Sequence, residues 1–141
     1  MRVHISLPVS NLARSQAFYS SLFGQAASKV KADYLNFRLD QPAIHLALVQ
    51  SDQAAPHPGQ HYGVELPDAE IFAEWESRAG QVIHAESVAP EADAKCCYAR
   101  AEKVWLTDPD GHRWELWHRT GEHDAMGETR PAESTADRSC G

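Results

Sequence analysis

The chain has 141 residues, of which 43% are hydrophobic and 23% are charged, a composition typical of one soluble, compact domain. Its net charge of −7 argues against a nucleic-acid or anionic-membrane partner. No apolar run approaches the roughly 20 residues of a membrane span, and the N-terminal residues lack the pattern of a secretory signal, so we expect a cytoplasmic protein.

Alternating apolar residues predict six strands, over residues 3–7, 35–39, 44–49, 60–66, 104–107 and 113–118. Two helices are predicted over residues 11–23 and 68–79. The first begins at Ser10 or Asn11 and the second at Asp68, which are N-cap residue types. They end before Gly24 and Gly80, each suited to a left-handed C-cap.

The order of strand, helix and further strands occurs twice. The first copy begins at His4-Ile-Ser-Leu-Pro and the second at His61-Tyr-Gly-Val-Glu-Leu-Pro, an offset of about 57 residues. Neither copy could bury a core alone, so modules of about residues 1–52 and 58–120 should pack as one domain, residues 1–120. Residues 121–141 are polar and small and are predicted to form a disordered tail.

Four side chains fall on the polar face of the predicted sheet when alternate residues are assigned to opposite faces. His4 and His61 occupy matching positions in the first strand of each copy, and His45 and Glu115 occupy matching positions in the last. A pseudo-twofold axis would bring the four together. Two imidazoles and one carboxylate are the ligand set of non-haem iron(II) oxygenases, although a lone strand histidine is more often structural.

Two adjacent cysteines, Cys96 and Cys97, follow the segment SVAPEADAK, which combines a proline with small and charged residues and is predicted to be a mobile loop. Three cysteines in the chain do not form a disulfide framework. The pair could be two small hydrophobic residues at the start of a strand. Alternatively, two thiolates side by side could bind a soft metal or metalloid ion.

The duplication and the stretch TDPDGHRWELW, residues 107–117, resemble the vicinal-oxygen-chelate superfamily of glyoxalases, extradiol dioxygenases and bleomycin-resistance proteins. This resemblance implies an α+β fold of paired βαβββ modules forming a cupped mixed sheet. It also implies that His4, His61 and Glu115 bind a metal.

The stretches VKADYLNFRLDQPAIHLALV, GQHYGVEL and AKCCYARAEKVWLTDPDGHRWELW resemble, more narrowly, the organoarsenical carbon–arsenic lyases, a family that overlaps with cadmium-induced proteins. The family implies an iron(II) dioxygenase that uses dioxygen to cleave trivalent organoarsenicals such as methylarsonous acid. Its vicinal cysteine pair, matched here by Cys96 and Cys97, binds the arsenic. Because trivalent arsenic in that substrate has two exchangeable hydroxyls, two adjacent thiolates can displace both.

Further residues have open roles. His45 stands where glyoxalases of the superfamily have a glutamate ligand, so it either binds metal or lines the pocket. Tyr98, Trp105 and Trp117 either shape the pocket or belong to the core. Cys140 is either inert or a third sulfur for arsenic or cadmium.

Two other functions compete with the dioxygenase. A sequestration protein would hold cadmium or arsenite through its cysteines and would not need His4, His61 and Glu115. A glyoxalase-like lyase or isomerase, or a thiol-transferring resistance enzyme, would not need the cysteine pair. The sequence leaves open the organic group on arsenic, the metal used in the cell and whether the chain forms a homodimer.

Overall fold

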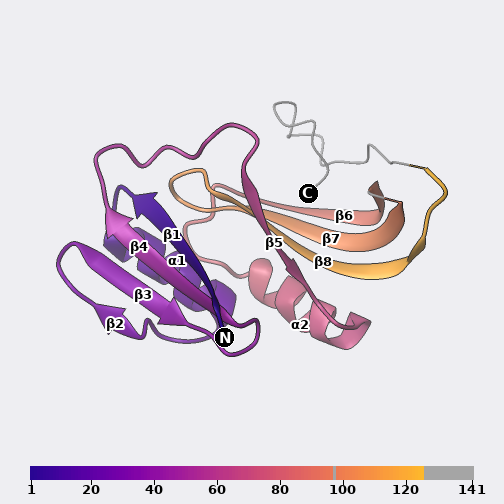
Figure 1. Cartoon of the computed structure of the whole chain (residues 1–141), viewed down its shortest axis with the longest axis horizontal. Helices are drawn as coiled ribbons and strands as arrows, with labels where there is room; N and C mark the ends of the chain where they lie inside the picture. The colour runs from indigo at the N-terminus through magenta and orange to yellow at the C-terminus, as the bar shows by residue number, and fades with distance from the viewer. Residues whose placement is uncertain (97, 126–141) are drawn as a thin grey trace.

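The computed structural model describes residues 1–96 and 98–125, which form two βαβββ modules (Figure 1). The first contains β1 (Val3–Val9), α1 (Leu12–Phe23), β2 (Lys29–Val30), β3 (Tyr34–Arg38) and β4 (Ile44–Gln50). The second contains β5 (His61–Glu65), α2 (Ala69–Ala79), β6 (Ser87–Cys96), β7 (Ala99–Thr107) and β8 (Arg113–Glu122). The predicted duplication is therefore confirmed. Neither helix in the described residues has the length and apolar character needed to cross a membrane.

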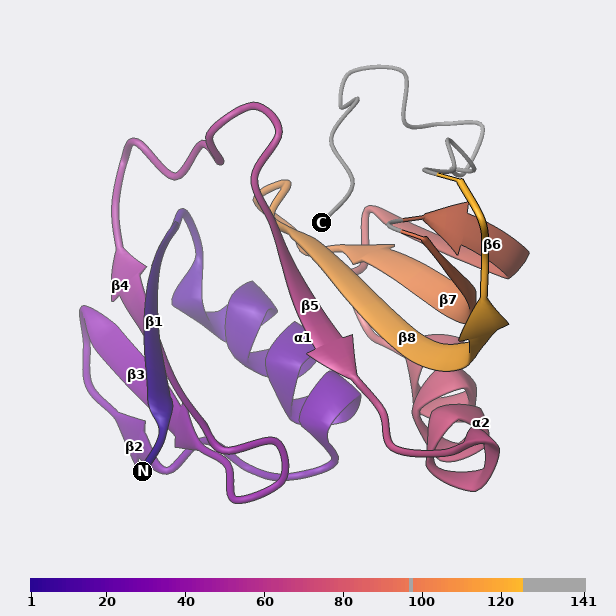
Figure 2. The same ribbon diagram turned by 45° about the vertical axis from the view of Figure 1, so that its right-hand side comes forward.

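Each module contributes one mixed four-stranded sheet, with the orders β1-β4-β3-β2 and β5-β8-β7-β6. In both sheets the first strand of the module pairs in parallel with its last strand, and the other pairs are antiparallel. The α+β class and the paired modules are as predicted. Among the described residues, β1 and β5 are both edge strands, and Figure 2 shows α1 between the two sheets.

The helix boundaries follow the predicted caps at three of four ends. Asn11 is the N-cap of α1, where its side chain accepts a hydrogen bond from the Arg14 amide, and Asp68 caps α2 in the same way. Gly24 has the expected left-handed conformation, with φ of 66°. The prediction for Gly80 is wrong. Gly80 stays right-handed, with φ of −65°, because its amide continues the helical pattern by donating to Glu76.

The segment predicted to be a mobile loop is instead the long strand β6, which pairs with β7 over nearly its whole length. The sequence pattern also missed the short strand β2 and the first half of β7. At the other end, β8 continues through Glu122, two residues into the segment predicted to be a tail. Residues 126–141 lie outside the described part of the chain.

The two modules share one hydrophobic core, in which aromatic side chains of α1 contact both sheets. Phe23 packs against Phe37 of the first sheet and against Trp75 of α2, with ring centroids 5.6 and 6.3 Å apart. Tyr19 packs edge-on against Trp114 of β8 at 5.9 Å. Because α1 fills the space between the modules with buried rings, these contacts hold the two sheets together.

A buried polar network crosses this core at Tyr19. The Tyr19 hydroxyl donates to Asp108 Oδ2 at 2.7 Å and accepts from the Trp114 indole at 3.0 Å. The other Asp108 oxygen accepts from the backbone amides of Asp110 and His112, which close the turn before β8. Burial raises the pKa of Asp108, and its hydrogen bonds oppose that shift. The network therefore ties α1 to the turn that sets the start of β8.

Replacing Tyr19 with phenylalanine should destabilise the fold by about 2 kcal/mol, because it leaves a buried carboxylate oxygen and a buried indole N–H without partners. Urea unfolding at neutral pH measures the effect. Tyr62→Phe is a matched control, since Tyr62 packs on the same Trp114 ring but its hydroxyl accepts from the exposed Gln60. An equal decrease in the free energy of unfolding in both variants would show that the hydrogen bonds of Tyr19 do not add to stability.

Candidate functional site

Two of the predicted metal ligands lie side by side on the second sheet. His61 begins β5 and Glu115 lies on the neighbouring strand β8, whose residues pair in parallel with those of β5. His61 Nε2 is 4.0 Å from Glu115 Oε2, and only 10% and 7% of the two side chains are exposed. Alternation along the strands turns both side chains to the same face, as predicted.

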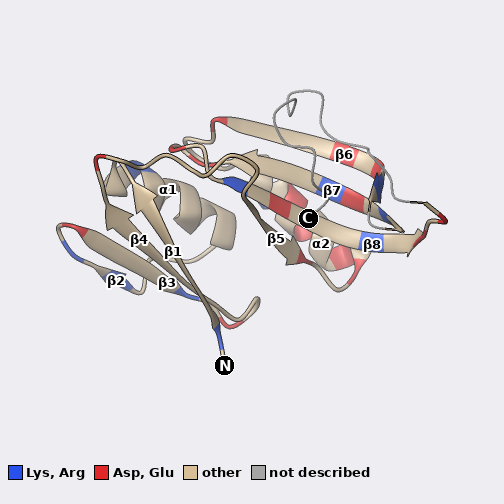
Figure 3. Cartoon of the chain, turned by 45° about the horizontal axis from the view of Figure 1, so that its top comes forward, with Lys and Arg blue, Asp and Glu red and all other residues tan. Residues whose placement is uncertain are grey.

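Charged and aromatic side chains surround this pair on the same face. Lys103 Nζ lies 3.4 Å from Glu115 Oε2, and the Trp105 ring packs edge-on against His61 with centroids 5.3 Å apart. The Arg113 guanidinium lies 4.7 Å from the centre of the Trp105 ring, whose indole N–H donates to Glu91 at 3.0 Å. Figure 3 shows acidic and basic residues interspersed along β7 and β8.

The other two predicted residues form a pair on the first sheet. His4 of β1 stands opposite His45 of β4, and their rings stack with centroids 4.6 Å apart. The Asn36 amide lies 3.2 Å from His45 Nε2 and donates to it, so that nitrogen is already engaged. Burial, then the neighbouring His4 and Arg38, lower the pKa of His45. The contact with Asn36 occupies His45 Nε2 and so disfavours this nitrogen as a fourth ligand.

The expected meeting of all four side chains is not seen in the described residues. His4 and His45 belong to one sheet and His61 and Glu115 to the other. No group of three histidine, cysteine, aspartate or glutamate side chains within residues 1–96 and 98–125 could hold a metal ion. The ligand set His4, His61 and Glu115 therefore stays a prediction, with two of its members adjacent.

Cys96 is the last residue of β6 and pairs with Ala99, the first residue of β7, so Cys96 lies at the tip of a hairpin. Ala99 lies six positions before Trp105, the partner of Glu115 in the ladder. The tip is therefore roughly 20 Å along the strands from Glu115. Cys96 is disulfide-bonded, so it could bind arsenic only after reduction. Cys97 and Cys140 lie outside the described residues.

The pairing of β6 with β7 shifts between Glu91 and Ala94, where two residues of β6 stand against one of β7. A second shift, between Arg100 and Ala101, lies in the pairing of β7 with β8. Asp93 has a positive φ of 50° within the first irregularity, and the Arg100 guanidinium donates to its carboxylate at 2.7 Å. This bond lowers the pKa of Asp93. Because bulges disrupt the ladder and bend strands, this part of the hairpin is a place where the tip can change direction.

The three aromatic residues predicted to shape a pocket lie in different places. Trp117 follows Glu115 on the same face of β8 and stands opposite Lys103 in the ladder. Tyr98 lies at the hairpin tip, 54% exposed and with a positive φ of 61°, so it is neither core nor near Glu115. Trp105 packs against His61, so Trp105 and Trp117 both lie beside the histidine–glutamate pair.

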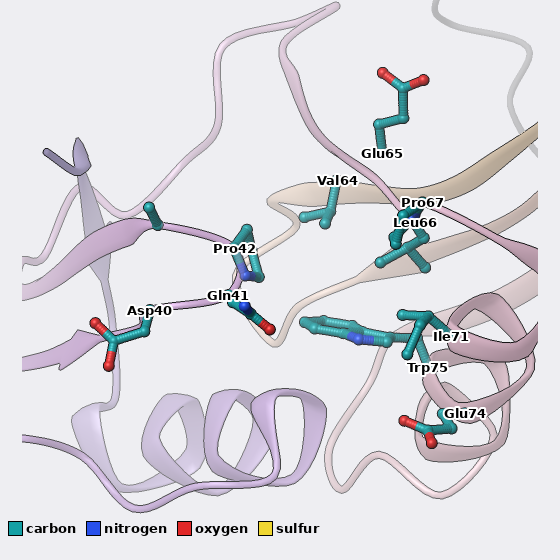
Figure 4. Close-up of a pocket in the computed structure, with 11 residues that line it drawn as sticks. Asp40, Gln41, Pro42, Val64, Glu65, Leu66, Pro67, Ile71, Glu74 and Trp75 are labelled. Atoms are coloured by element: carbon teal, nitrogen blue, oxygen red, sulfur yellow. The ribbon is translucent and has the colours of Figure 1, made fainter.

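A cavity of about 510 Å³ lies elsewhere, among the β3–β4 connection, β5 and α2. Figure 4 shows the Trp75 ring facing Gln41 and Pro42 across it, while the carboxylates of Asp40, Glu65 and Glu74 point away. None of the predicted site residues that the structure describes lines this cavity. The cavity and the histidine–glutamate pair are therefore separate features.

Sequence reasoning missed Lys103 and Glu91. Lys103 alternates with the buried residues Val104 and Leu106 on β7, and it shares a face with Ala101, Trp105 and Thr107. The available signal was weak: Lys103 directly precedes the predicted strand 104–107, at a position that would share the face of Trp105 if the strand were extended by one residue. Glu91 could not be found, because its segment was predicted to be a loop.

Comparison with known proteins matches residues 2–116 to the family described as the Glyoxalase/Bleomycin resistance protein/Dioxygenase superfamily. A protein of Bacillus sp. (strain MD1) named trivalent organoarsenical cleaving enzyme is 35% identical over 117 residues, covering 82% of this chain and 71% of that protein. One of the same name from Thermomonospora curvata is 34% identical over 133 residues, covering 89% and 82%. The cadmium-induced protein CadI of Mycobacterium tuberculosis is 32% identical over 142 aligned positions, covering 96% and 88%.

Among solved structures, the crystal structure of a glyoxalase/bleomycin resistance protein/dioxygenase from Alicyclobacillus acidocaldarius superposes with a TM-score of 0.66. The two chains are 18% identical, and the match covers 84% of this chain and 91% of the other. At that identity the likeness concerns the fold alone, and it agrees with the paired modules described above.

Proposed function

Because the chain belongs to the Glyoxalase/Bleomycin resistance protein/Dioxygenase superfamily, we propose that it cleaves the carbon–arsenic bond of trivalent organoarsenicals such as methylarsonous acid and releases arsenite. Relatives named for organoarsenical cleavage, at 34% and 35% identity, support this activity. The observation that carries the proposal is that one sheet bears both predicted metal ligands and a predicted arsenic ligand. His61 and Glu115 lie on its face, and Cys96 lies at the tip of its hairpin.

The proposed cofactor is iron(II), held by His61, Glu115 and His4. The chemistry of the donors fits, since two imidazoles and a carboxylate are the ligands of non-haem iron oxygenases. His61 Nε2 and Glu115 Oε2 are 4.0 Å apart, so the two side chains must approach each other by about 1 Å to bind one ion as neighbouring ligands with bonds of about 2 Å. Iron(II), when bound, supplies the redox chemistry with dioxygen that no amino-acid side chain provides.

The third donor, His4, lies on the other sheet, and its strand β1 is an edge strand among the described residues, as is the strand β5 that bears His61. An approach of these two edges would bring His4 toward His61. We propose that the edges meet either through closure of one chain or through a homodimer in which each copy supplies one half of the site.

Cys96 and Cys97 are the proposed arsenic ligands. Both thiols must be reduced, and each thiolate then displaces one hydroxyl from trivalent arsenic and releases it as water or hydroxide. The role of Lys95, next to the pair, is to add positive charge that favours the thiolate form. Because the tip lies far along the strands from Glu115, the proposal requires the hairpin to bend near Asp93, where the pairing of β6 with β7 shifts, close to the shift in the pairing of β7 with β8.

Sequestration without turnover is the second candidate. It is favoured by the lack of a three-residue metal group in the described residues and by the relatives named cadmium-induced protein. Sequestration needs the cysteines alone. Cleavage needs the cysteines together with His61 and Glu115.

Arsenite release from methylarsonous acid separates the two candidates. The reduced protein should release arsenite in air when iron(II) is added, and the release should stop when a chelator removes the iron or when oxygen is excluded. Tight binding of methylarsonous acid without arsenite release under any of these conditions would contradict cleavage and establish sequestration.

A further inference from the structure

A buried cation already occupies the face of Glu115 on which a metal would bind. Lys103 is 8% exposed, and its Nζ lies 3.4 Å from Glu115 Oε2. The same oxygen is the one that lies 4.0 Å from His61 Nε2. A divalent ion between His61 and Glu115 must therefore approach an oxygen that is bound to an ammonium group.

A second buried carboxylate stands on the other side of Lys103. Glu91 of β6 is directly opposite Lys103 of β7 in the antiparallel ladder, and it is 8% exposed. Its Oε2 accepts from the Trp105 indole, whereas its Oε1 is buried and has no hydrogen-bond partner among the residues that the structure describes. Directly opposite residues have Cβ atoms about 5 Å apart, so a lysine side chain can reach either carboxylate by changing rotamers.

The surroundings favour both positions of the ammonium. Its present position is 5.7 Å from the centre of the Trp105 ring, within the range of a cation–π contact. A buried acceptor without a partner is unfavourable, and an ammonium group at Glu91 would satisfy Oε1. A lysine between two buried carboxylates thus has two places in which its charge is compensated.

We propose that Lys103 is a two-position counter-ion: it binds Glu115 when no metal is present, and it moves to Glu91 when a divalent ion binds Glu115 and His61. The inference rests on the metal site of the proposed function, but not on the cleavage of arsenicals. Lys103 lowers the metal affinity by competing for Glu115, and Glu91 limits that cost by accepting the displaced ammonium group. Both are positioning residues.

The test is a double-mutant cycle in which the dissociation constant of cobalt(II) is measured by calorimetry on the reduced, full-length chain. Lys103→Met should tighten cobalt binding by about tenfold, because it removes a competing charge within a few ångströms of the ion. Lys103→Arg should stay near the wild-type value. Glu91→Gln should weaken binding by about tenfold when Lys103 is present and by less than about twofold when it is combined with Lys103→Met. Lys29→Met, on the exposed strand β2, is the control.

Three outcomes would overturn the proposal: unchanged or weaker cobalt binding in Lys103→Met, an equal effect of Glu91→Gln in both backgrounds, or a wild type whose cobalt binding does not require Glu115. If Lys103→Met folds only with cobalt present, the ion has replaced the missing counter-ion, which supports the proposal. Melting curves with and without cobalt show this. If the variants show the expected changes in cobalt affinity but the wild type releases no arsenite, the proposed function is refuted and the role of Lys103 stands.

Discussion

Replacing Glu115 with glutamine should lower arsenite release by at least about a hundredfold, while the reduced thiols still bind methylarsonous acid. The amide keeps the size of the side chain but loses the negative charge, and a neutral amide oxygen is a much poorer ligand for a divalent ion. In known metal sites, replacing a residue that only hydrogen-bonds to a ligand already lowers metal affinity or activity by about 10- to 100-fold. The loss of a ligand itself should lower activity further. His61→Ala should behave in the same way.

The control for this prediction is Glu65→Gln, which removes an exposed carboxylate from β5, the strand that also bears His61. Its activity should stay at the wild-type level. Iron content, arsenic binding and arsenite release should be measured on every variant. Full activity in Glu115→Gln, with iron retained, would remove Glu115 from the site and leave the histidine–glutamate contact as a structural pair.

Variants of the two half-sites also decide whether two copies share a site. His4→Ala and His61→Ala are each expected to be inactive when alone. If each site combines His4 of one copy with His61 of another, then mixing the two variants restores about a quarter of the wild-type activity. Half of randomly formed dimers are mixed, and one of their two sites is intact. No recovery on mixing would place both histidines of a site in the same chain.

Much of the fold could be predicted because its signals are local. The N-caps Asn11 and Asp68 and the left-handed Gly24 each depend on a few neighbouring residues. The strands that bear His4, His45, His61 and Glu115 alternate cleanly, so their faces could be assigned from the pattern. The duplication then showed which strands correspond.

Strand β6 could not be predicted, because Pro90 and the acidic residues around it are typical of a loop. The structure shows why a strand is tolerated there. Within the described residues, β6 is the edge of its sheet, with only β7 as its neighbour. A proline on an edge strand can turn its missing N–H toward the unpaired side without breaking a ladder bond. Whether a strand lies at an edge depends on the whole sheet and cannot be read from one segment.

The site was predictable in pieces, and the assembly of those pieces was not. Strand alternation placed His61 and Glu115 on one face, and the structure puts them 4.0 Å apart. How far the two sheets lie from each other is set by the aromatic packing of α1, which no strand pattern encodes. For the same reason the hypothesis that His4 joins the pair depends on a rearrangement or a second copy.

The cysteine pair provides the strongest remaining test of cleavage. Cys96→Ser and Cys97→Ser, assayed in the presence of a reductant, should each lower arsenite release by at least about a hundredfold. A hydroxyl is a poor ligand for trivalent arsenic at neutral pH, and a single remaining thiol loses the advantage of binding in pairs. Cys96 is half-buried at the end of an edge strand, so a serine of similar size should fit without a large loss of stability.

Three measurements on these variants separate arsenic binding from a structural role: iron content, melting temperature and arsenite release. If the two cysteines bind arsenic, the variants should keep normal iron content and melting temperature and release almost no arsenite. Buried structural thiols predict the opposite, namely a lower melting temperature with normal release from the folded fraction, and that result would refute arsenic binding by the pair. Cys140→Ser is the matched control, because it removes one thiol outside the pair. If Cys140→Ser also abolished release, three sulfur ligands rather than two would hold the arsenic.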